Sequence, residues 1–365
     1  MFSSGRSHYI RKQYYIEIPY WIFLLSLFVI IRFSGLEDAF PTVQVYIDRN
    51  IGHQLIIGLV SGFLTGFLMA TARVYLLKKS CSTMSVGNVI LIQTATGVVL
   101  FTLSNFLVSQ FYLLQFNYST EQIENFLVHD YTKSSILILY AYIISASLYF
   151  NLLLEADKKL GINVLKNLIL GKYHIPTEEE RIFMFMDMKD STGIAEKLGH
   201  LRYSHFLQDV FKLSTDIVID KKGEIYQFVG DEMVVTWPSA LGYQNNNTLQ
   251  FFYKFQAILE KNEASFMKTY GVIPLFKAGI HIGVVSVAEV GEINTQIAYH
   301  GDVVNTTSRI QELCNKFHTN LLVSDSFIKG IEAPLLNFQE NAAIINLRGR
   351  QQPITVYALD VSMPD

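Results

Sequence analysis

The chain has 365 residues, half of them apolar and only 17% charged, with a formal net charge of -3. That length allows two domains, and the balanced charge argues against a broad nucleic-acid-binding surface, so we expect no nucleic-acid partner. The apolar residues concentrate before Glu155, and the remainder has an ordinary globular composition. Cys81 and Cys314 are far apart and form no CxxC motif, which favours two reduced thiols over a disulfide or a zinc site.

Four apolar segments precede Glu155: Ile18–Phe33, Ile51–Leu77, Val86–Leu114 and Ser135–Leu154. The last three are long enough to cross a hydrocarbon core of about 30 Å, which takes about 20 helical residues. The first is shorter, with Pro19 near its start, and a cleaved signal peptide is the competing interpretation. Arg32 and Phe33 end this segment where a small-residue cleavage site belongs, so we favour a helix. Residues 1–154 are therefore expected to form a transmembrane domain of four helices in a lipid bilayer.

Charge predicts the orientation of this domain. Basic residues lie before the first segment, between the second and third, and after the fourth, whereas the other two loops are mainly acidic. The positive-inside rule then places both termini in the cytoplasm of a multi-pass protein of the cell (inner) membrane. His53 and Arg73 lie near segment ends, so we expect them at the interfaces rather than in an ion path.

Small residues recur every four positions in the second segment, at Gly58, Gly62, Gly66 and Ala70. Such a row lets another helix approach closely, either within the four-helix unit or in a second chain, and both alternatives stay open. Residues 155–176 read as a connector: a helix from Glu155 to Leu170, ended by Gly171, with Pro176 opening the next domain.

Residues 177–365 mix strands and helices in the core order β-α-β-β-α-β, which suits an α+β ferredoxin-like sheet with helices on one face. The expected strands are Arg181–Met188, Gly223–Val229, Met233–Trp237, a hairpin of Leu275–Val285 and Val287–Val290, Gln296–Tyr299, Asn320–Val323, Ala343–Arg348 and Ile354–Leu359. The expected helices are Ser191–Leu198, Leu201–Asp220, Asn247–Tyr270 and Val303–Cys314.

Two carboxylates mark a candidate metal site. The apolar run of the first strand stops at Asp187, and Gly230 gives Asp231 a flexible turn at a hairpin tip. In a ferredoxin-like sheet these two positions lie side by side, so the carboxylates could flank a pair of hard divalent cations. The alternative is an acidic strand end at which Asp190 or Ser191 is an ordinary helix N-cap.

A second constellation follows at Asn305 and Arg309, which are four residues apart and therefore share one helix face. An amide that orients a sugar and a guanidinium that neutralises phosphate charge complement a two-metal phosphoryl site.

Together these motifs resemble the catalytic domain of class III nucleotidyl cyclases over about Arg181 to Leu359. The matches are Phe185-x-Asp187 with Ser191-Thr192, Phe228-Val-Gly230-Asp231-Glu232, Gly279-Ile-His-Ile-Gly283 and Gly301-x-x-x-Asn305-x-x-x-Arg309. The resemblance implies a head-to-tail homodimer that converts a nucleoside triphosphate, ATP to 3′,5′-cyclic AMP and pyrophosphate, at sites on the dimer interface.

The same resemblance assigns the site residues. It places two Mg²⁺ or Mn²⁺ ions per active site at Asp187, Met188 and Asp231, and it places Asp190, Ser191, Thr192 and Gly230 at the substrate. From the other chain, Asn305 orients the ribose and Arg309 stabilises charge on the α-phosphate. Arg348 or Arg350 holds the terminal phosphates.

The base pocket departs from the family. Adenylyl cyclases usually carry lysine and aspartate or threonine, and guanylyl cyclases glutamate and cysteine, where this chain has Gln227 and Ala298. The base is therefore open: ATP is expected, with GTP or a pyrimidine nucleotide as alternatives. A catalytically silent nucleotide-binding or regulatory domain is a second hypothesis. A diguanylate cyclase is disfavoured, because the doubled glycine of its signature is missing and Asn305 with Arg309 has no role there.

Overall fold

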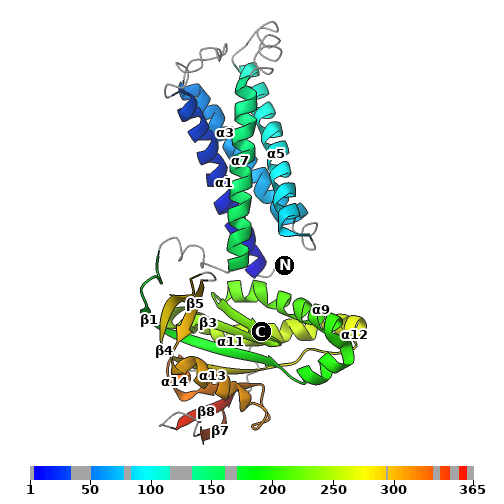
Figure 1. The fold of residues 1–365 in the computed structure, drawn as a ribbon, viewed down its shortest axis with the longest axis vertical. Helices are drawn as coiled ribbons and strands as arrows, with labels where there is room; N and C mark the ends of the chain where they lie inside the picture. Colours follow the sequence, from blue (N-terminus) through cyan, green and yellow to red (C-terminus); the bar gives the residue numbers. More distant parts are fainter. Residues whose placement is uncertain are drawn as a thin grey trace. The chain divides into compact units, whose positions relative to one another are not determined.

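The computed structural model describes residues 4–33, 51–77, 84–115, 134–160, 171–292, 295–331, 338–345 and 353–359. The chain divides into two compact units, residues 1–159 and residues 160–365 (Figure 1).

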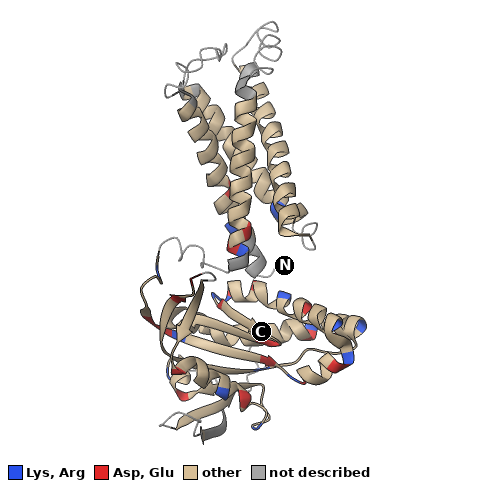
Figure 2. Ribbon diagram, in the orientation of Figure 1, with Lys and Arg blue, Asp and Glu red and all other residues tan. Residues whose placement is uncertain are grey.

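The first unit is built from long apolar helices: α1 (Ser4–Phe33), α3 (Ile51–Ala72), α5 (Val86–Gln115) and α7 (Ser134–Leu160). A π-helical segment, η1 (Arg73–Leu77), continues α3. Within the described residues, four stretches are long and apolar enough to cross a membrane: Ile10–Ile31, Gln54–Leu77, Val86–Phe111 and Leu137–Lys158. Charged side chains are sparse along these helices (Figure 2). The four predicted membrane helices are thus confirmed as candidate spans.

The first helix is longer than predicted. Helix α1 begins at Ser4, so Pro19 lies inside it rather than near its start. Proline is tolerated inside membrane helices because neighbouring helices re-satisfy the freed main-chain groups, and α1 packs along α3.

The row of small residues in α3 is used within the chain. A Cβ built on Gly62 would lie 2.7 Å from the Cα of Ile22, and one on Gly66 would lie 2.7 Å from the Cα of Ile18. At these positions the main chains of α1 and α3 touch because neither glycine carries a side chain. Of the two open alternatives, Gly62 and Gly66 therefore belong to packing inside the four-helix unit.

Arg73 has inward contacts that the sequence analysis did not anticipate. It is 3% exposed, and its Nε is 2.6 Å from Oε1 of Glu17 on α1. Its Nη1 donates to Gln93 on α5 at 2.6 Å, and its Nη2 donates to Asn151 on α7 at 2.8 Å. The sequence showed the depth of Arg73 along the helix but not which face points inward. The side chain of His53 lies outside the described residues.

The second unit contains a mixed sheet with strand order β2-β3-β1-β4-β6-β8-β7, and β5 pairs β4. Its described strands are β1 (Thr177–Met188), β2 (Glu224–Val229), β3 (Glu232–Pro238), β4 (Phe276–Val290), β5 (Gln296–His300), β6 (Leu321–Ser324), β7 (Phe338–Ile345) and β8 (Ile354–Leu359). The run β2-β3-β1-β4 is the ferredoxin-like arrangement that the sequence predicted. Central strand β1 is antiparallel to both β3 and β4.

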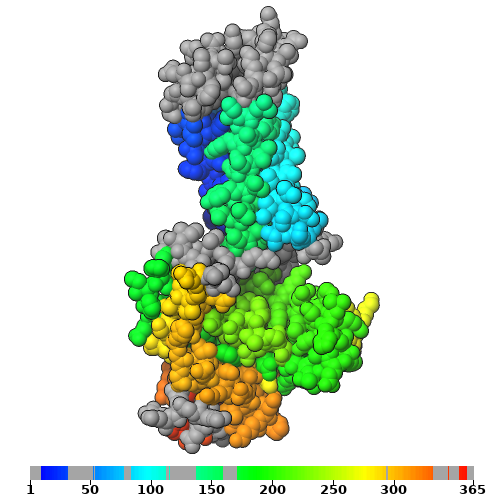
Figure 3. All heavy atoms as spheres, in the orientation of Figure 1, coloured from blue at the N-terminus to red at the C-terminus, as the bar shows by residue number. Residues whose placement is uncertain are grey.

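Helices cover both faces of this sheet, which corrects the expectation of helices on one face only (Figure 1). Ile182, Met184 and Met186 of β1 pack against α9 (Ser191–Asp220) and α11 (Asn247–Lys261) in one core. Phe183 and Phe185, which alternate with them, pack on the opposite face against Val303 of α13 (Asp302–Glu312). Segments β4, β5 and α13 lie side by side at the surface (Figure 3). Smaller helices are α10 (Ser239–Tyr243), η3 (Gln244–Asn246), α12 (Glu263–Tyr270) and α14 (Asp325–Ile328).

Several boundaries differ from the prediction. The expected hairpin at residues 275–290 is one continuous strand, β4, whose antiparallel partner is β5. The expected helix Asn247–Tyr270 breaks at Asn262, whose side chain donates to the Ile258 carbonyl at 2.7 Å. The predicted break between the two helices after Asp190 is confirmed at Gly199, where φ is 72°. Strand β7 starts earlier than predicted, at Phe338.

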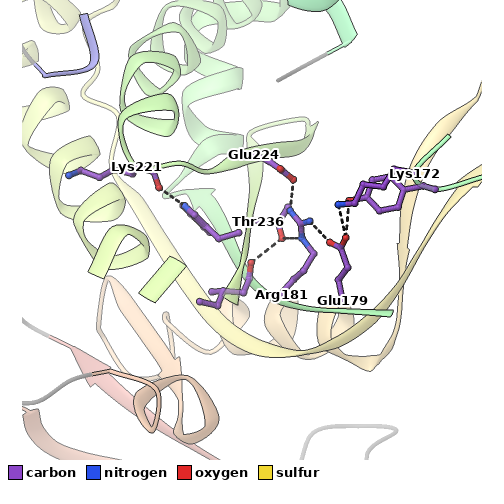
Figure 4. Close-up of polar contacts among 9 residues, drawn as sticks. Lys172, Glu179, Arg181, Lys221, Glu224 and Thr236 are labelled. Atoms are coloured by element: carbon purple, nitrogen blue, oxygen red, sulfur yellow. Dashed lines mark hydrogen bonds and ion pairs between the residues drawn. The ribbon is translucent and has the colours of Figure 1, made fainter. Parts of the chain in front are cut away.

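A network of polar side chains connects the first residues of this unit to strands β2 and β3 (Figure 4). Buried Arg181 of β1 donates to Glu179 at 2.8 Å and to Thr236 of β3 at 3.1 Å, and it ion-pairs with Glu224 of β2. Lys172 reaches Glu179 at 3.0 Å. The predicted connector helix is seen as the end of α7 up to Leu160, and residues 161–170 lie outside the described residues.

Cys314 is buried just after the end of α13, and its Sγ donates to the Ala278 carbonyl of β4 at 3.3 Å. Burial raises the pKa of this thiol to about 12. A protonated, inaccessible thiol fits the predicted reduced state. Cys81 lies outside the described residues.

Candidate active site

The two predicted metal carboxylates meet. Asp187 is the penultimate residue of β1, and Asp231 lies in the two-residue turn between β2 and β3, next to Gly230 with φ of 61°. The pairing of Met186 with Met233 brings the end of β1 beside that turn. Burial raises the pKa of Asp187, and the adjacent carboxylate of Asp231 raises it further, whereas Lys277 opposes both. The end of β1 therefore lies beside the β2–β3 turn, near enough for the charge of Asp231 to act on Asp187.

One carboxylate oxygen of the acid pair lacks a partner among the described residues. Oδ2 of Asp231 is buried and has no hydrogen-bond partner among the described residues. Burial, followed by the charges of Asp187, Asp231 and Glu312, raises the pKa of Glu232 to about 7. Like charges gathered around an unpaired buried oxygen are what a bound divalent cation would neutralise. The residues present thus fit a hard cation.

The ligand set is small. Among the described residues, no group of three or more histidine, cysteine, aspartate or glutamate side chains is arranged to hold a metal ion. Met188, the last residue of β1, is 2% exposed and pairs with Phe276. Because a thioether is a poor ligand for a hard cation, any contribution from Met188 falls to its carbonyl.

Two further residues touch Asp187 and were missed by the sequence analysis. Lys277 of β4 places its Nζ 3.1 Å from Oδ2 of Asp187. Gln311 of α13 donates from Nε2 to the same oxygen at 3.4 Å. Lys277 is paired across the sheet with Asp187, a register that the sequence did not reveal. The sequence signal that could have identified Lys277 is its position two residues before Gly279, the first residue of the Gly279–Gly283 motif.

The first turn of α9 follows the acid pair. Asp190 precedes the helix with φ of 54° and makes no side-chain cap, so the N-cap alternative is wrong for its side chain. Burial, followed by the charge of Asp231, raises the pKa of Tyr203 on the same helix, and the neighbouring Ser191 opposes that rise. Ser191 therefore begins a helix close to the carboxylates, whereas Thr192 is exposed beside it.

The Gly279-Ile-His-Ile-Gly283 motif allows α13 to lie on β4. A Cβ on Gly279 would lie 2.4 Å from the main-chain nitrogen of Gln311, and one on Gly283 would lie 2.6 Å from Val303. On the resulting helix, Asn305 is exposed and Arg309 is half-buried. Neither makes a hydrogen bond or ion pair with another side chain in the described part of the chain.

The base-pocket candidates lie elsewhere on the sheet. Gln227 is exposed on edge strand β2, and Ala298 is half-buried on β5, opposite Ala288. The ring of Tyr299 packs edge-on against Tyr226, with centroids 4.9 Å apart, and carries the Arg181 guanidinium at 4.9 Å. Tyr299 is therefore a packing residue. Arg348 and Arg350 lie outside the described residues.

Comparison with known proteins decides the family. Residues 175–360, just over half the chain, match the adenylate and guanylate cyclase catalytic domain. The chain belongs to this family. It is 31% identical over 222 residues to Adenylate cyclase 2 of Rhizobium meliloti, covering 61% of each protein. It is 24% identical over 185 residues to an adenylate cyclase of Anabaena cylindrica, covering 48% of this chain and 35% of the relative.

A solved structure agrees on the fold. A bacterial light-regulated adenylyl cyclase superposes with a TM-score of 0.51 at 17% identity, covering 64% of this chain and 67% of that one. The match to the Rhizobium and Anabaena cyclases spans less than two thirds of their length. The class III cyclase catalytic domain predicted from the sequence is confirmed, together with its preceding candidate membrane helices.

Proposed function

We propose that this chain is a membrane-bound nucleotidyl cyclase that converts ATP to 3′,5′-cyclic AMP and pyrophosphate in a homodimer. One observation carries the proposal: Asp187 and Asp231 are held together at the end of β1, with a buried oxygen of Asp231 unpartnered among the described residues. Membership of the cyclase family supports the reaction class. The names of the adenylate cyclase relatives support ATP as the substrate.

Asp187 and Asp231, with the carbonyl of Met188, would hold two Mg²⁺ or Mn²⁺ ions. Bound there, such cations lower the pKa of the ribose 3′-hydroxyl and neutralise triphosphate charge. Lys277, 3.1 Å from Asp187, is an ammonium at the same place and can donate to phosphate oxygens. The first turn of α9, with Asp190, Ser191 and Thr192, offers main-chain N–H groups and hydroxyls to the same anion.

The partner subunit completes the site in this proposal. Asn305 orients the ribose, and Arg309 stabilises charge on the α-phosphate as pyrophosphate leaves. The support is that Asn305 is exposed and that neither side chain is bound by another in the described part of the chain. Phe228 and Val229, 47% and 55% exposed beside Gly230, are apolar surface that a dimer can cover. Arg348 or Arg350 would bind the terminal phosphates.

The topology completes the proposal. Basic residues flank the chain ends of the four-helix unit and the connection between α3 and α5, including Lys12, Lys78 and Lys158. By the positive-inside rule, both termini and the cyclase unit lie in the cytoplasm.

Product analysis tests the proposal. Full-length protein in lipid nanodiscs receives Mn²⁺ and equimolar ATP, GTP, CTP and UTP, and mass spectrometry identifies the cyclic products. We expect cyclic AMP to dominate and Asp187→Ala to abolish it without unfolding. Undiminished turnover by Asp187→Ala would overturn the assignment, and a dominant product from another base would replace ATP as the substrate.

Gln227 and Ala298 favour a second candidate, a cyclase-like domain that binds nucleotides without turnover. The same preparation separates the two. Calorimetric binding of a nucleoside triphosphate, with no cyclic product from any of the four, would support the silent domain.

A further inference from the structure

The inner face of α13 touches the carboxylate of its own chain. Gln311 is 3% exposed, and its Nε2 donates to Oδ2 of Asp187 at 3.4 Å. Lys277 reaches that same oxygen at 3.1 Å. One carboxylate oxygen of Asp187 thus receives an ammonium from β4 and an amide from α13, and its other oxygen makes neither contact.

A glycine contact sets this geometry. Gly279 of β4 pairs with Phe185, two residues before Asp187 on β1. A Cβ on Gly279 would lie 2.4 Å from the nitrogen and 2.7 Å from the Cα of Gln311. The main chain of α13 therefore rests on the strand at Gln311 itself, which brings this side chain to the acid pair.

The outer face of the same short helix carries Asn305 and Arg309. Helix α13 has 11 residues, from Asp302 to Glu312, so one rigid element presents both faces. In the proposed homodimer the outer face belongs to the partner's site, whereas Gln311 belongs to the site of its own chain. A displacement of α13 would consequently change both active sites together.

We propose that Gln311 is a positioning residue that orients Asp187 for cation binding and makes α13 a rigid link between the two active sites. The link between sites rests on the proposed homodimer; the orientation of Asp187 rests on contacts within one chain. The amide donates to one oxygen of Asp187 and so turns the other toward the cation. Outer-shell hydrogen bonds of this kind typically change metal affinity by about 10–100-fold.

Direct Mn²⁺ binding tests the first part. Full-length protein in nanodiscs is titrated with Mn²⁺ without nucleotide, and the electron paramagnetic resonance signal of free Mn²⁺ reports binding. Gln311→Met keeps the length of the side chain and removes the donor. We expect it to weaken Mn²⁺ binding by about tenfold or more. The matched control is Thr307→Val, also buried on α13, whose hydroxyl donates to the Val303 carbonyl of its own helix and to no other group among the described residues. An unchanged dissociation constant in Gln311→Met, or an equal loss in both variants, would overturn the proposal.

Mixed dimers test whether Gln311 acts on the site of its own chain within the proposed homodimer. One subunit carries Asp187→Ala and lends Asn305 and Arg309; the other carries Asn305→Ala with Arg309→Ala and supplies Asp187, so each mixed dimer has one complete site. Gln311→Met in the subunit with intact Asp187 should raise the Mn²⁺ concentration needed for activity. In the other subunit, Gln311→Met should leave the Mn²⁺ dependence unchanged, because the Asp187 that Gln311 contacts in that chain is already replaced by alanine.

The outcomes separate the two claims. Equal effects from both placements, or none from either, contradict the role of Gln311. If the mixed dimers without Gln311→Met form no product, the proposed dimer and the link through α13 are contradicted. The orientation of Asp187 by Gln311 still stands in that case, provided that Gln311→Met weakens Mn²⁺ binding as expected.

Discussion

The polar core of the four-helix unit and the acid pair of the cyclase unit both bury charged groups, but they complete them differently. Around Arg73, the guanidinium meets Glu17, Gln93 and Asn151, one side chain from each of the other three helices. Around Asp187, a second carboxylate lies alongside, and an oxygen of Asp231 stays unpaired in the described part of the chain. The network around Arg73, in which the protein itself pairs the charged groups, is called the closed network here and contributes to stability. The network around Asp187 and Asp231, which leaves an oxygen unpaired, is called the open network and is suited to bind a ligand.

The open network gives the largest expected effect. Asp231→Asn removes a cation ligand, and we expect cyclase activity to fall by about a thousandfold or more, equivalent to several kcal/mol. The same variant removes like-charge repulsion, so its melting temperature without cations should equal or exceed that of the parent. Thermal unfolding with and without Mn²⁺ checks both: Mn²⁺ should stabilise the parent and not the variant. A variant that melts much earlier without Mn²⁺ would show that this acid pair is structural.

The closed network gives the opposite response. Glu17→Gln leaves Arg73 buried without its counter-charge, so we expect a loss of about 3 kcal/mol in unfolding free energy. Denaturation of the full chain in detergent measures it. A double variant, Glu17→Met with Arg73→Met, should lose less than the sum of the two single changes, because no lone charge remains. Strictly additive losses would show that the pair is not coupled.

Close helix contact gives a smaller effect. Gly62→Ala brings a methyl group against the main chain of α1, 2.7 Å from the Cα of Ile22, so we expect a loss of about 1–3 kcal/mol. Gly58→Ala is the matched control, since the nearest atom to its new methyl group is Cγ2 of the Val29 side chain at 3.3 Å rather than main chain at 2.7 Å. Thermal unfolding of both variants checks this, and equal stability would refute the packing described here.

The smallest expected effect concerns a single hydrogen bond of the closed network, the one between Arg73 and Asn151. Asn151→Leu removes the amide that accepts from Arg73 at 2.8 Å, and interhelical hydrogen bonds in membranes are worth about 1 kcal/mol. Ser145 on the same helix is exposed and bonds to its own helix at Ala141, so Ser145→Ala should leave stability unchanged. If Ser145→Ala lowers the unfolding free energy as much as Asn151→Leu does, the hydrogen bond between Asn151 and Arg73 makes no specific contribution to stability.

The sequence predicted those features that periodicity and local motifs encode. Apolar length marked the membrane helices, and the strand ending at Asp187 with the glycine turn before Asp231 predicted that the two acids meet. Each of these signals lies within a short stretch of chain, where spacing determines geometry.

Contacts between distant segments were not predictable in this way. Lys277 and Gln311 reach Asp187 through strand register and through the seat of α13 on Gly279, neither of which is written in a local pattern. The partners of Arg73 were missed for a related reason: a single charge near a helix end does not show which side chains three other helices bring to it.

The buried thiol of Cys314 has a practical consequence. It follows the end of α13 and contacts β4, and because it is buried with a raised pKa we expect it to react only when this segment moves away from the sheet. In a Cys81→Ser background, the rate of alkylation of the full chain therefore counts those openings directly, by an intrinsic reporter that needs no added label. Slower alkylation in the presence of Mn²⁺ and nucleotide would register how firmly ligands hold down the helix that carries Arg309.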